Sequence, residues 1–396
     1  MAGMEDEEIR VLQYVKVLDR GGLESFILNY AQYLQKYNIY FDYLVTRDCC
    51  EPYEDAIREL GGHKIIVEID NNNRIKKGIQ EYFKFYKYFS DCGYNIIHFE
   101  SISPSIQGNL VLLAAKVAGI KKRIVHSHIA REGYQNYKGL KNIIYKITKH
   151  NNCKWGTNFW ACSGIAAEFA FTDKVIQSSK YALIKNAIDT NRFKYNQDSR
   201  LNIRKIYNHT NKYIIGVVAR FVNQKNHLFA LDIIEHLIKI DSKYVLWFIG
   251  EKSDDEPEVL DLVKETIKKK KLEKNVLFVG GVKNVNEYYS AMDYFLQPSF
   301  FEGLPVSLIE AQASGLKCIV SDNISSEAFV TNNVIPLNLS SGSYEWAKCI
   351  NSFLNYERED CSQKMIEAGY DIENNAQKLA KLYRGLNNYE GKNITE

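Results

Sequence analysis

Apolar runs that read as β-strands alternate with amphipathic, helix-like stretches along almost the whole chain, and this rhythm constrains the fold more than any other feature. The strand-like runs are β-branched and aromatic, and they are apolar at successive positions. Strands buried on both faces of a parallel sheet have this pattern. In the first half the runs lie at residues 9–18, 40–46, 63–69, 94–100, 122–129, 159–163 and 181–187. Such alternation predicts a doubly wound α/β fold.

The alternation of strand-like and helix-like stretches stops at residues 191–212, which are polar and lack a strong apolar period. It resumes after this segment. The later strand-like runs lie at residues 213–220, 245–250, 276–281, 294–299 and 317–322. We therefore predict Rossmann-like domains at residues 1–190 and 191–370, with a C-terminal helix at 371–396 that crosses back to the N-terminal domain. Two such parallel sheets would face each other across a cleft, with ligands bound beyond the carboxyl ends of the strands.

Composition excludes several classes of function. Lys and Arg number 51 against 48 Asp and Glu, a net charge of +3, which is too balanced for wholesale nucleic-acid binding. The eight Cys show no pair with the two-residue spacing of a zinc site. The acidic N-terminal residues lack the features of a signal peptide, and no stretch approaches the roughly 20 apolar residues of a membrane span. We expect a cytoplasmic protein.

Two features of the first half could contact a ligand. Gly21 and Gly22 follow the first strand-like run and open a helical stretch, where free N–H groups can meet an anion. The full G-x-G-x-x-G fingerprint is absent, which counts against a nicotinamide dehydrogenase. His126 and His128 end a later strand-like run and can donate to a hydroxyl or phosphate, although a buried His bonded to a backbone carbonyl is an equal alternative. Of the two, His128 is the better candidate because it lies closer to the loop.

Cations follow the first strand-like run of the second half. Arg220 ends that run, and Lys225 stands five residues later, just before a helical stretch that begins near residue 226. A cation at a strand end and another before a helix can clamp a diphosphate between them. The alternative is a pair of solvated surface charges, and the location favours the clamp.

The strongest local signal is PSFFEGLPVSLIEAQASG, at residues 298–315. Glu302 lies in the loop after a strand-like run, beside Gly303, which allows close backbone approach. Glu310 lies eight positions later in a helical stretch with apolar neighbours, so it should be half-buried and need a partner such as two ribose hydroxyls. Glu302 could hold hydroxyls of a sugar. The alternative is a capping carboxylate together with a solvated helix Glu.

In these residues the chain resembles glycosyltransferase family 4, the large group of retaining GT-B enzymes, and within it the branch that builds capsular and extracellular polysaccharides. Five features coincide in order, and the E-x7-E motif within FEGLP is the most specific of them. The features are the loop at residues 21–24, the strand end at 126–128, the linker at 186–189, Arg220 with Lys225, and Glu302 with Glu310. The resemblance spans nearly the whole chain.

The resemblance implies roles for the residues of the first half. Gly21 and Gly22 would let their loop approach the donor diphosphate or the acceptor, and His128 would meet the donor sugar near the reacting carbon. Asn186 would contact the ligand at the linker. There the family usually has Gly after Asn, and this chain has Ala187, which weakens Asn186 as a contact.

The resemblance also implies roles in the second half. Arg220 and Lys225 would neutralise the leaving diphosphate, although Ala219 stands where the family often has Gly. Glu302, with the amides of Gly303 and Leu304, would hold the sugar and phosphate. Glu310 would hold the ribose, and Val282 would contact the base. The implied catalytic residues are His128, Arg220, Lys225 and Glu302.

The function implied is a hexosyltransferase of class EC 2.4 that moves a sugar from a nucleoside-diphosphate donor, by family expectation UDP-linked, to a glycan or lipid-linked acceptor. No convincing D-x-D site appears in a strand-end loop, so we expect no metal or other cofactor. A nucleotide-sugar epimerase on the same fold and a non-catalytic partner subunit are the alternatives.

Lysines mixed with aromatic residues in the helical stretch at 74–89, and further lysines at 138–150, suit an interfacial helix near anionic lipid. A membrane surface is therefore a second candidate partner, with peripheral attachment at the inner face. An aromatic face packed on the sheet, with solvated lysines opposite, explains the same pattern equally well.

Overall fold

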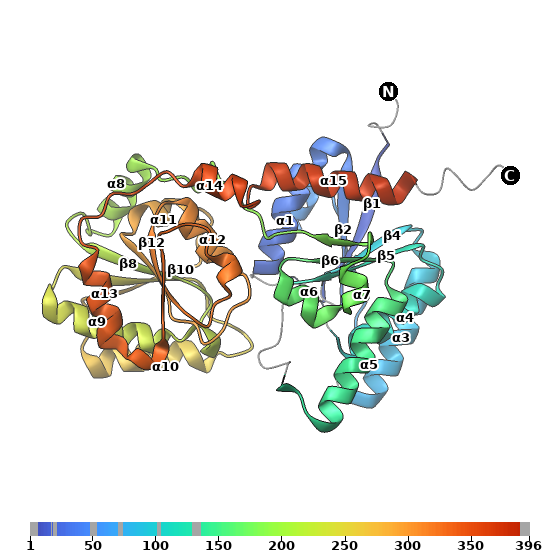
Figure 1. Ribbon diagram of the computed structural model, residues 1–396, viewed down its shortest axis with the longest axis horizontal. Coiled ribbons are helices and arrows are strands. Elements are labelled where there is room, and N and C mark those ends of the chain that lie inside the picture. Colours follow the sequence, from blue (N-terminus) through green and yellow to red (C-terminus); the bar gives the residue numbers. More distant parts are fainter. Residues whose placement is uncertain are drawn as a thin grey trace. The chain divides into compact units, whose positions relative to one another are not determined.

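The computed structural model describes residues 7–16, 18, 22–47, 54–69, 74–100, 104–128 and 136–388 of the chain. The chain divides into two compact units, each a sheet with flanking helices (Figure 1). Unit 1 comprises Met1–Asn186 and Ile372–Glu396, and unit 2 comprises Ala187–Asp371. The division expected from the sequence was 1–190, 191–370 and 371–396.

Unit 1 is built on a seven-stranded parallel sheet in the order β3-β2-β1-β4-β5-β6-β7. Its strands are β1 (Ile9–Tyr14), β2 (Ile39–Val45), β3 (Lys64–Ile66), β4 (Ile96–Phe99), β5 (Lys122–Ser127), β6 (Asn158–Ala161) and β7 (Tyr181–Leu183). Its helices are α1 (Gly22–Leu34), η1 (Gln35–Tyr37), α2 (Glu54–Glu59), α3 (Arg74–Asp91), α4 (Ile106–Val117), α5 (Gly139–Trp155), α6 (Gly164–Ala170), α7 (Asp173–Ile176) and α15 (Ile372–Asn388).

Unit 2 is built on a six-stranded parallel sheet in the order β10-β9-β8-β11-β12-β13. Its strands are β8 (Tyr213–Val218), β9 (Tyr244–Ile249), β10 (Val276–Gly280), β11 (Tyr294–Gln297), β12 (Lys317–Ser321) and β13 (Val334–Leu337). Its helices are α8 (Gln197–Ile206), η4 (Asn223–Lys225), α9 (His227–Ile240), α10 (Glu258–Lys270), α11 (Val285–Ala291), α12 (Val306–Ala313), η5 (Ser326–Ala328), η6 (Leu339–Ser341), α13 (Ser343–Ser352) and α14 (Ser362–Glu367).

The central strands are buried on both faces, which explains their continuous apolar runs. All six residues of β9 are buried, and apolar clusters lie on the two sides of its sheet, around Trp247 on one side and Phe248 on the other. The prediction of Rossmann-like α/β units with parallel sheets is therefore confirmed. Within the described ranges, no helix has both the length and the apolarity that crossing a bilayer requires.

Each sheet reverses its strand order at one point, and that point decides where a ligand can sit. In unit 1 the reversal falls between β1 and β4, and in unit 2 between β8 and β11. The loops that leave such neighbouring strands run in opposite directions and open a crevice beyond their carboxyl ends. The residues that follow β8 and β11 are therefore the first candidates for a site in unit 2.

Candidate functional site

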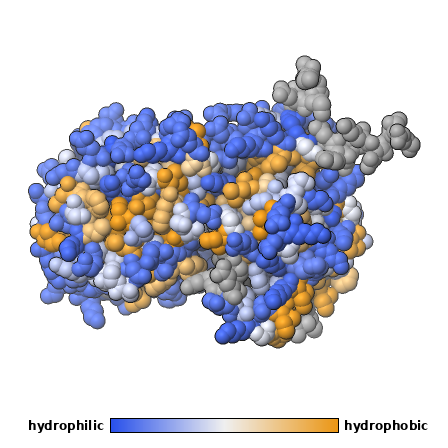
Figure 2. Space-filling view, viewed as in Figure 1, coloured by the Kyte–Doolittle hydropathy of each residue, from blue (hydrophilic) through white to orange (hydrophobic). Residues whose placement is uncertain are grey.

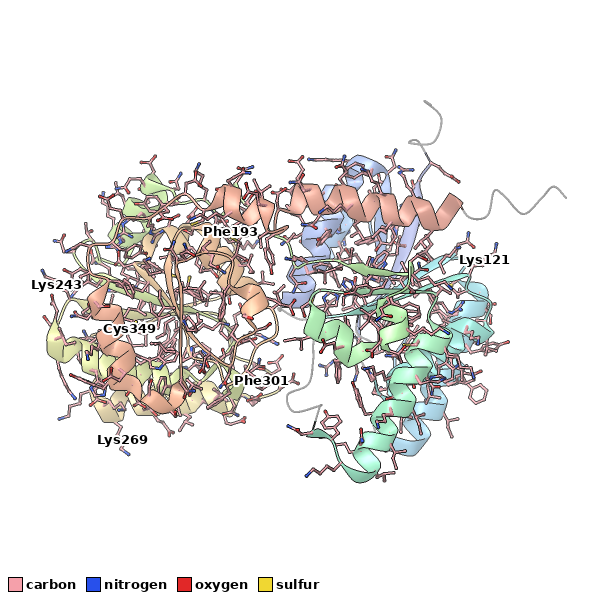
Figure 3. The ribbon with its side chains drawn as sticks, in the orientation of Figure 1. Lys121, Phe193, Lys243, Lys269, Phe301 and Cys349 are labelled. Atoms are coloured by element: carbon pink, nitrogen blue, oxygen red, sulfur yellow. The ribbon has the colours of Figure 1, made fainter. Side chains whose placement is uncertain are left out.

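Two loops of unit 2 meet at the reversal between β8 and β11. The first contains Arg220 and Lys225, and the second runs from Pro298 to Pro305 and includes Phe301, which is labelled in Figure 3. Arg220 is exposed at the end of β8. Gly250, at the end of the neighbouring β9, has φ +149°, and a Cβ there would lie 2.0 Å from the carbonyl oxygen of Ala219. A glycine is therefore needed for the two strand ends to pack this closely.

Hydrogen bonds fasten these two loops to each other. The Phe300 amide donates to the carbonyl oxygen of Gln224 at 2.9 Å, and the Gln224 side chain donates to the carbonyl oxygen of Phe301, also at 2.9 Å. The Asn226 side chain donates to the carbonyl oxygen of Pro298 at 3.1 Å. Bonds on both sides of Lys225 fix its backbone, so its side chain is held facing the second loop.

Lys225 and Glu302, which the sequence predicted as site residues, form a direct ion pair. The Ser299 hydroxyl also donates to Glu302 Oε1 at 3.1 Å, and Gln297 Nε2 donates to the same oxygen at 3.4 Å. The side chains of Lys225 and Glu302 are only 20% and 9% exposed. A cation and a carboxylate are thus preorganised at the reversal point, and little ordering remains for a ligand to impose.

Open space and unused donors adjoin this pair. A Cβ built on Gly303 would have no heavy atom within 4 Å. In the described part of the chain, no acceptor takes a hydrogen bond from the amide of Gly303 or Leu304. The helix α12 begins just beyond them, with Pro305 at its N-cap. Amides of this kind at a helix start favour an anion.

Glu310 lies in α12 and is half-buried, as the sequence predicted. Its partner is the hydroxyl of Tyr289 from α11, which donates to Oε2 at 2.8 Å. Loss of solvent raises the pKa of Glu310 to about 7, and the Tyr289 hydrogen bond and the charge of Arg192 only partly oppose this rise. One carboxylate oxygen is therefore held by the protein, which the sequence analysis did not anticipate.

Two further residues of unit 2, Leu304 and Val282, were also predicted to contact the donor. Leu304 is 8% exposed and packs in the core, so only its backbone can contribute to a site. Val282 lies in the loop between β10 and α11 and packs, partly buried, against the same core as α12. The structure thus joins Lys225 directly to Glu302, while Glu310 is held separately by Tyr289.

In unit 1, His128 lies just after β5 and bonds Glu100, the residue that follows β4. The same carboxylate bonds His126 Nδ1 at 3.0 Å, and His98 Nε2 lies 3.3 Å from its other oxygen. All four side chains are at most 8% exposed. The sequence analysis missed Glu100, although its place at the end of a buried strand was a usable signal.

Two opposing effects set the charges of these histidines: burial lowers the pKa of each, and the charge of Glu100 raises it. Burial lowers the pKa of His98 to about 3 and that of His126 to about 4, so both are neutral at pH 7. Burial also disfavours the charged form of His128, but the charge of Glu100 outweighs it and raises the pKa of His128 to about 9. The neighbouring histidines hold the pKa of Glu100 well below its usual range. The result is a buried ion pair between Glu100 and His128.

Part of this cluster has the residue types and spacing of a metal site. Donor atoms of His98, Glu100 and His126 lie within 4.8 Å of one another. These atoms are engaged in hydrogen bonds, since His98 also bonds His126 at 3.1 Å and the Tyr383 hydroxyl at 2.6 Å. We therefore describe the cluster as a polar network that fastens α15 to the sheet of unit 1.

Three further predicted residues lie in unit 1. Gly22 is the first residue of α1, at the reversal between β1 and β4, and Gly21 lies outside the described residues. Asn186 ends this part of unit 1, is 8% exposed, and has a buried Oδ1 without a hydrogen-bond partner in the described structure. Burying an acceptor without a hydrogen bond costs free energy, so Asn186 is still a candidate ligand contact.

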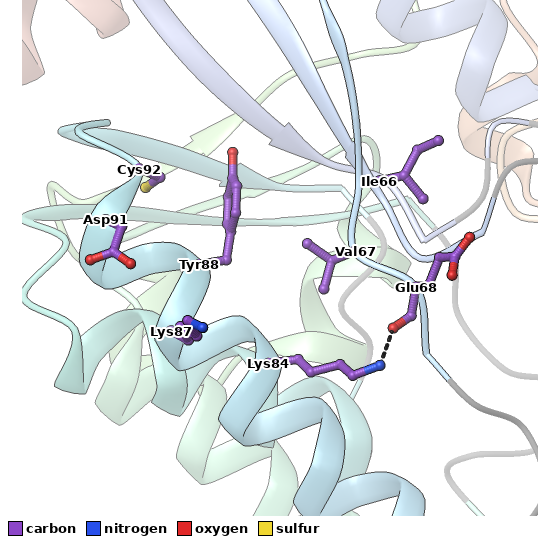
Figure 4. A pocket seen from close by; sticks show the side chains of 8 residues that line it. All are labelled: Ile66, Val67, Glu68, Lys84, Lys87, Tyr88, Asp91 and Cys92. Atoms are coloured by element: carbon purple, nitrogen blue, oxygen red, sulfur yellow. Dashed lines mark hydrogen bonds between the residues drawn. The ribbon is translucent and has the colours of Figure 1, made fainter.

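An open groove of about 640 Å³ lies elsewhere in unit 1, between β3 and α3. Figure 4 shows its lining, including Lys84, whose ammonium donates to the carbonyl oxygen of Glu68 at 2.8 Å. None of the residues predicted to bind the donor lines this groove, although Lys84 and Lys87 belong to the stretch predicted to meet a membrane surface. The predicted donor-binding residues lie in loops that follow strands, whereas this groove lies between β3 and α3.

Residues 199–372, most of unit 2, match the family model described as glycosyl transferases group 1. The chain is 29% identical to the glycosyltransferase named EpsF of Bacillus subtilis (strain 168), over 96% of this chain and 97% of that protein. It is 26% identical to the UDP-Gal:alpha-D-GlcNAc-diphosphoundecaprenol alpha-1,3-galactosyltransferase of Escherichia coli, over 83% and 84%.

Other curated relatives are named for capsular polysaccharide and lipopolysaccharide core biosynthesis. Among solved structures, that of HepE of Anabaena in complex with UDP and glucose is similar in fold. Its TM-score is 0.70 at 14% identity, and the match covers 98% of this chain and 99% of that one.

Proposed function

We propose that this chain, a glycosyltransferase with group 1 similarity and relatives in polysaccharide biosynthesis, is a retaining enzyme that uses a UDP-linked sugar. The acceptor in this proposal is a lipid-linked glycan of a cell-surface polysaccharide. The observation that carries the proposal is the ion pair of Lys225 and Glu302, fixed at the reversal between β8 and β11 beside open space and unused amides.

Each group in this site has a task that its chemistry suits. Lys225 and Arg220 stabilise the negative charge that develops on the departing diphosphate, and the amides of Gly303 and Leu304 bond its oxygens. Glu302 accepts hydrogen bonds from hydroxyls of the transferred sugar. Glu310 accepts from the ribose through the oxygen that Tyr289 does not hold. Catalysis then rests on positioning and electrostatic stabilisation.

Retention of configuration needs the acceptor to attack from the face that the diphosphate leaves. We propose that the departing phosphate takes the proton of the acceptor hydroxyl on that face, with no protein nucleophile. His128, kept protonated by Glu100, would donate to a sugar hydroxyl near the reacting carbon.

The names of similar proteins support the proposed donor and acceptor. HepE is described in complex with UDP and glucose, and the Escherichia coli relative is named for a UDP-linked donor and a diphosphoundecaprenol acceptor. These names support a UDP donor and a lipid-linked acceptor for this chain. The identity of the sugar stays open between the common UDP-hexoses.

A thermal-shift screen of nucleotide sugars tests the donor, because a ligand that binds only the folded state raises the melting temperature. The donor identified should then be incubated with a lipid-linked acceptor, and the anomeric configuration of the product read by NMR. An inverted product would contradict retention. Isomerised donor formed without any acceptor would favour an epimerase, and donor binding without transfer or hydrolysis would favour a non-catalytic subunit.

Removal of metal ions is expected to leave the rate nearly unchanged. Lys225 and Arg220 supply the positive charge that a divalent cation supplies in metal-dependent transfer. The initial rate should be compared before and after treatment with EDTA, with a known metal-dependent transferase treated in parallel. A loss of activity that added Mg²⁺ or Mn²⁺ restores would refute metal independence.

Donor affinity is expected to fall as the pH drops through 7. Below its pKa of about 7 Glu310 is protonated and accepts fewer hydrogen bonds, so binding at pH 6 should be about tenfold weaker than at pH 8. Calorimetry with a nucleotide sugar suits this test because its diphosphate diester keeps its charge across that range. Glu310→Gln should bind weakly at both values. An equal pH dependence in this variant would show that another group titrates.

A further inference from the structure

Helix α5 of unit 1 carries an apolar stripe that faces solvent. Leu140, Ile143, Ile144 and Ile147 are 71%, 56%, 36% and 54% exposed. Their spacing of i, i+3, i+4 and i+7 places them on one face of the helix. A stripe with this spacing normally faces the core of a protein, whereas here it has no cover within the described structure. We call these four residues the α5 stripe.

The inner side of α5 carries buried polar residues beside Cys153 and Trp155, which are partly buried and pack on the core of unit 1. The buried residues of α5 are Thr148 and Asn152. The side chain of Asn109 in α4 donates to Asn152 Oδ1 at 2.7 Å and to the carbonyl oxygen of Thr148 at 3.1 Å. These bonds fix the rotation of α5 about its axis. The α5 stripe is therefore held outward by specific contacts.

Neighbouring helices extend the apolar surface. Helix α4 packs against both α3 and α5. Ile79 and Phe83 on α3 are 58% and 61% exposed, and Ile106 at the start of α4 is 60% exposed. Figure 2 shows apolar surface gathered over this part of unit 1, at the lower right of the view. Exposed apolar side chains gathered in this way mark an interaction site.

The charged side chains of helix α5 itself all have one sign. Helix α5 contains four lysines and no Asp or Glu. Lys141 and Lys146 are exposed, and their positions in the helix place them on opposite sides of the stripe. On α3, exposed Lys87 follows Phe83 by one turn and also lines the groove of Figure 4. The partner should therefore be apolar and negatively charged.

We propose that the α5 stripe and its flanking lysines dock the protein on an anionic lipid surface. Apolar side chains of an amphipathic helix enter the boundary between headgroups and acyl chains, and lysines pair with anionic headgroups. Each Lys near such a surface strengthens binding about fivefold. A second copy of the chain is a poorer occupant, because two lysine-flanked stripes would repel each other. The proposal does not depend on sugar transfer.

Vesicle sedimentation tests the proposal without measuring catalysis. The wild-type chain should sediment with vesicles of phosphatidylglycerol and phosphatidylcholine, stay in solution with phosphatidylcholine alone, and be released as salt is raised. Ile143→Gln with Ile147→Gln should weaken binding about tenfold or more. Lys141→Glu with Lys146→Glu should do the same. These residues are exposed, so the variants should keep the wild-type melting temperature.

The matched control is Leu201→Gln with Ile206→Gln in α8 of unit 2, where the two side chains are 50% and 67% exposed. This control should bind vesicles like the wild type. The proposal is overturned if the wild-type chain does not sediment with anionic vesicles, or if the α5 variants bind these vesicles as tightly as the wild type does. It is also overturned if the control variant loses as much vesicle binding as the α5 variants. It is also overturned if size-exclusion chromatography shows a wild-type dimer that the isoleucine variant dissociates, because the stripe would then be a dimer interface.

Discussion

Replacing Lys225 by alanine is expected to lower kcat about a hundredfold, which is the usual effect of removing one fixed group that stabilises a developing negative charge. The ammonium is held toward the second loop by hydrogen bonds on both sides of it and by Glu302. Steady-state kinetics with saturating donor and acceptor measure the effect.

The control for this variant is Lys239→Ala in α9, where the lysine is 64% exposed and pairs with Glu235 of the same helix. This variant should keep wild-type kcat, and both variants should keep the wild-type circular dichroism spectrum. If Lys225→Ala turned over at the wild-type rate with saturating donor, the lysine would be a surface charge, and the assignment of the diphosphate site would be wrong.

Replacing Glu100 by glutamine is expected to lower the free energy of unfolding of unit 1 by about 3 kcal/mol at neutral pH, because one partner of a buried ion pair is lost. The pH dependence gives a second signature. The pKa of His128 is raised to about 9 in the folded state, against about 6.5 in the unfolded chain. The stability that its proton contributes is therefore complete below pH 6.5 and is lost as the pH rises to 9. The free energy of unfolding of the Glu100→Gln variant should not show this loss between pH 6.5 and 9.

Hydrogen exchange of β4 and β5 is a suitable measurement, since it reports on unit 1 alone. Glu168→Gln, at an exposed position of α6 in the same unit, is the control and should change protection little. If Glu100→Gln left protection and its pH dependence unchanged, the carboxylate would not hold His128 charged. The proposed role of His128 at the donor sugar would then lose its electrostatic basis.

The fold was predictable because buried parallel strands leave a continuous apolar signature. The runs at 213–220 and 294–299 contain β8 and β11. The run at 9–18 overstated β1, which ends at Tyr14. Apolar residues continue beyond a strand wherever the following loop is also buried, so strand ends are less certain than strand positions. Lys225 and Glu302 could be named because each follows a recognisable strand.

What escaped prediction depends on contacts between residues distant in sequence. The order of strands in each sheet, which makes the loops after β8 and β11 neighbours, is not encoded in any local pattern. Tyr289 reaches Glu310 from another helix, and Tyr383 reaches His98 across 285 positions. The exposure of the α5 stripe is a case of the same kind, because it follows from the bonds that Asn109 makes to α5.

The proposed donor site of unit 2 consists of Lys225, Glu302 and Glu310, and a comparison of donor affinities shows whether these residues bind the donor. Calorimetric titration should use the nucleotide sugar that stabilises the wild-type chain, with Lys225→Ala, Glu302→Gln, Glu310→Gln and the Lys239→Ala control. We predict that the control binds like the wild type and that the other three variants bind at least about tenfold more weakly. Wild-type Kd values in all three variants would show that these residues do not bind the donor.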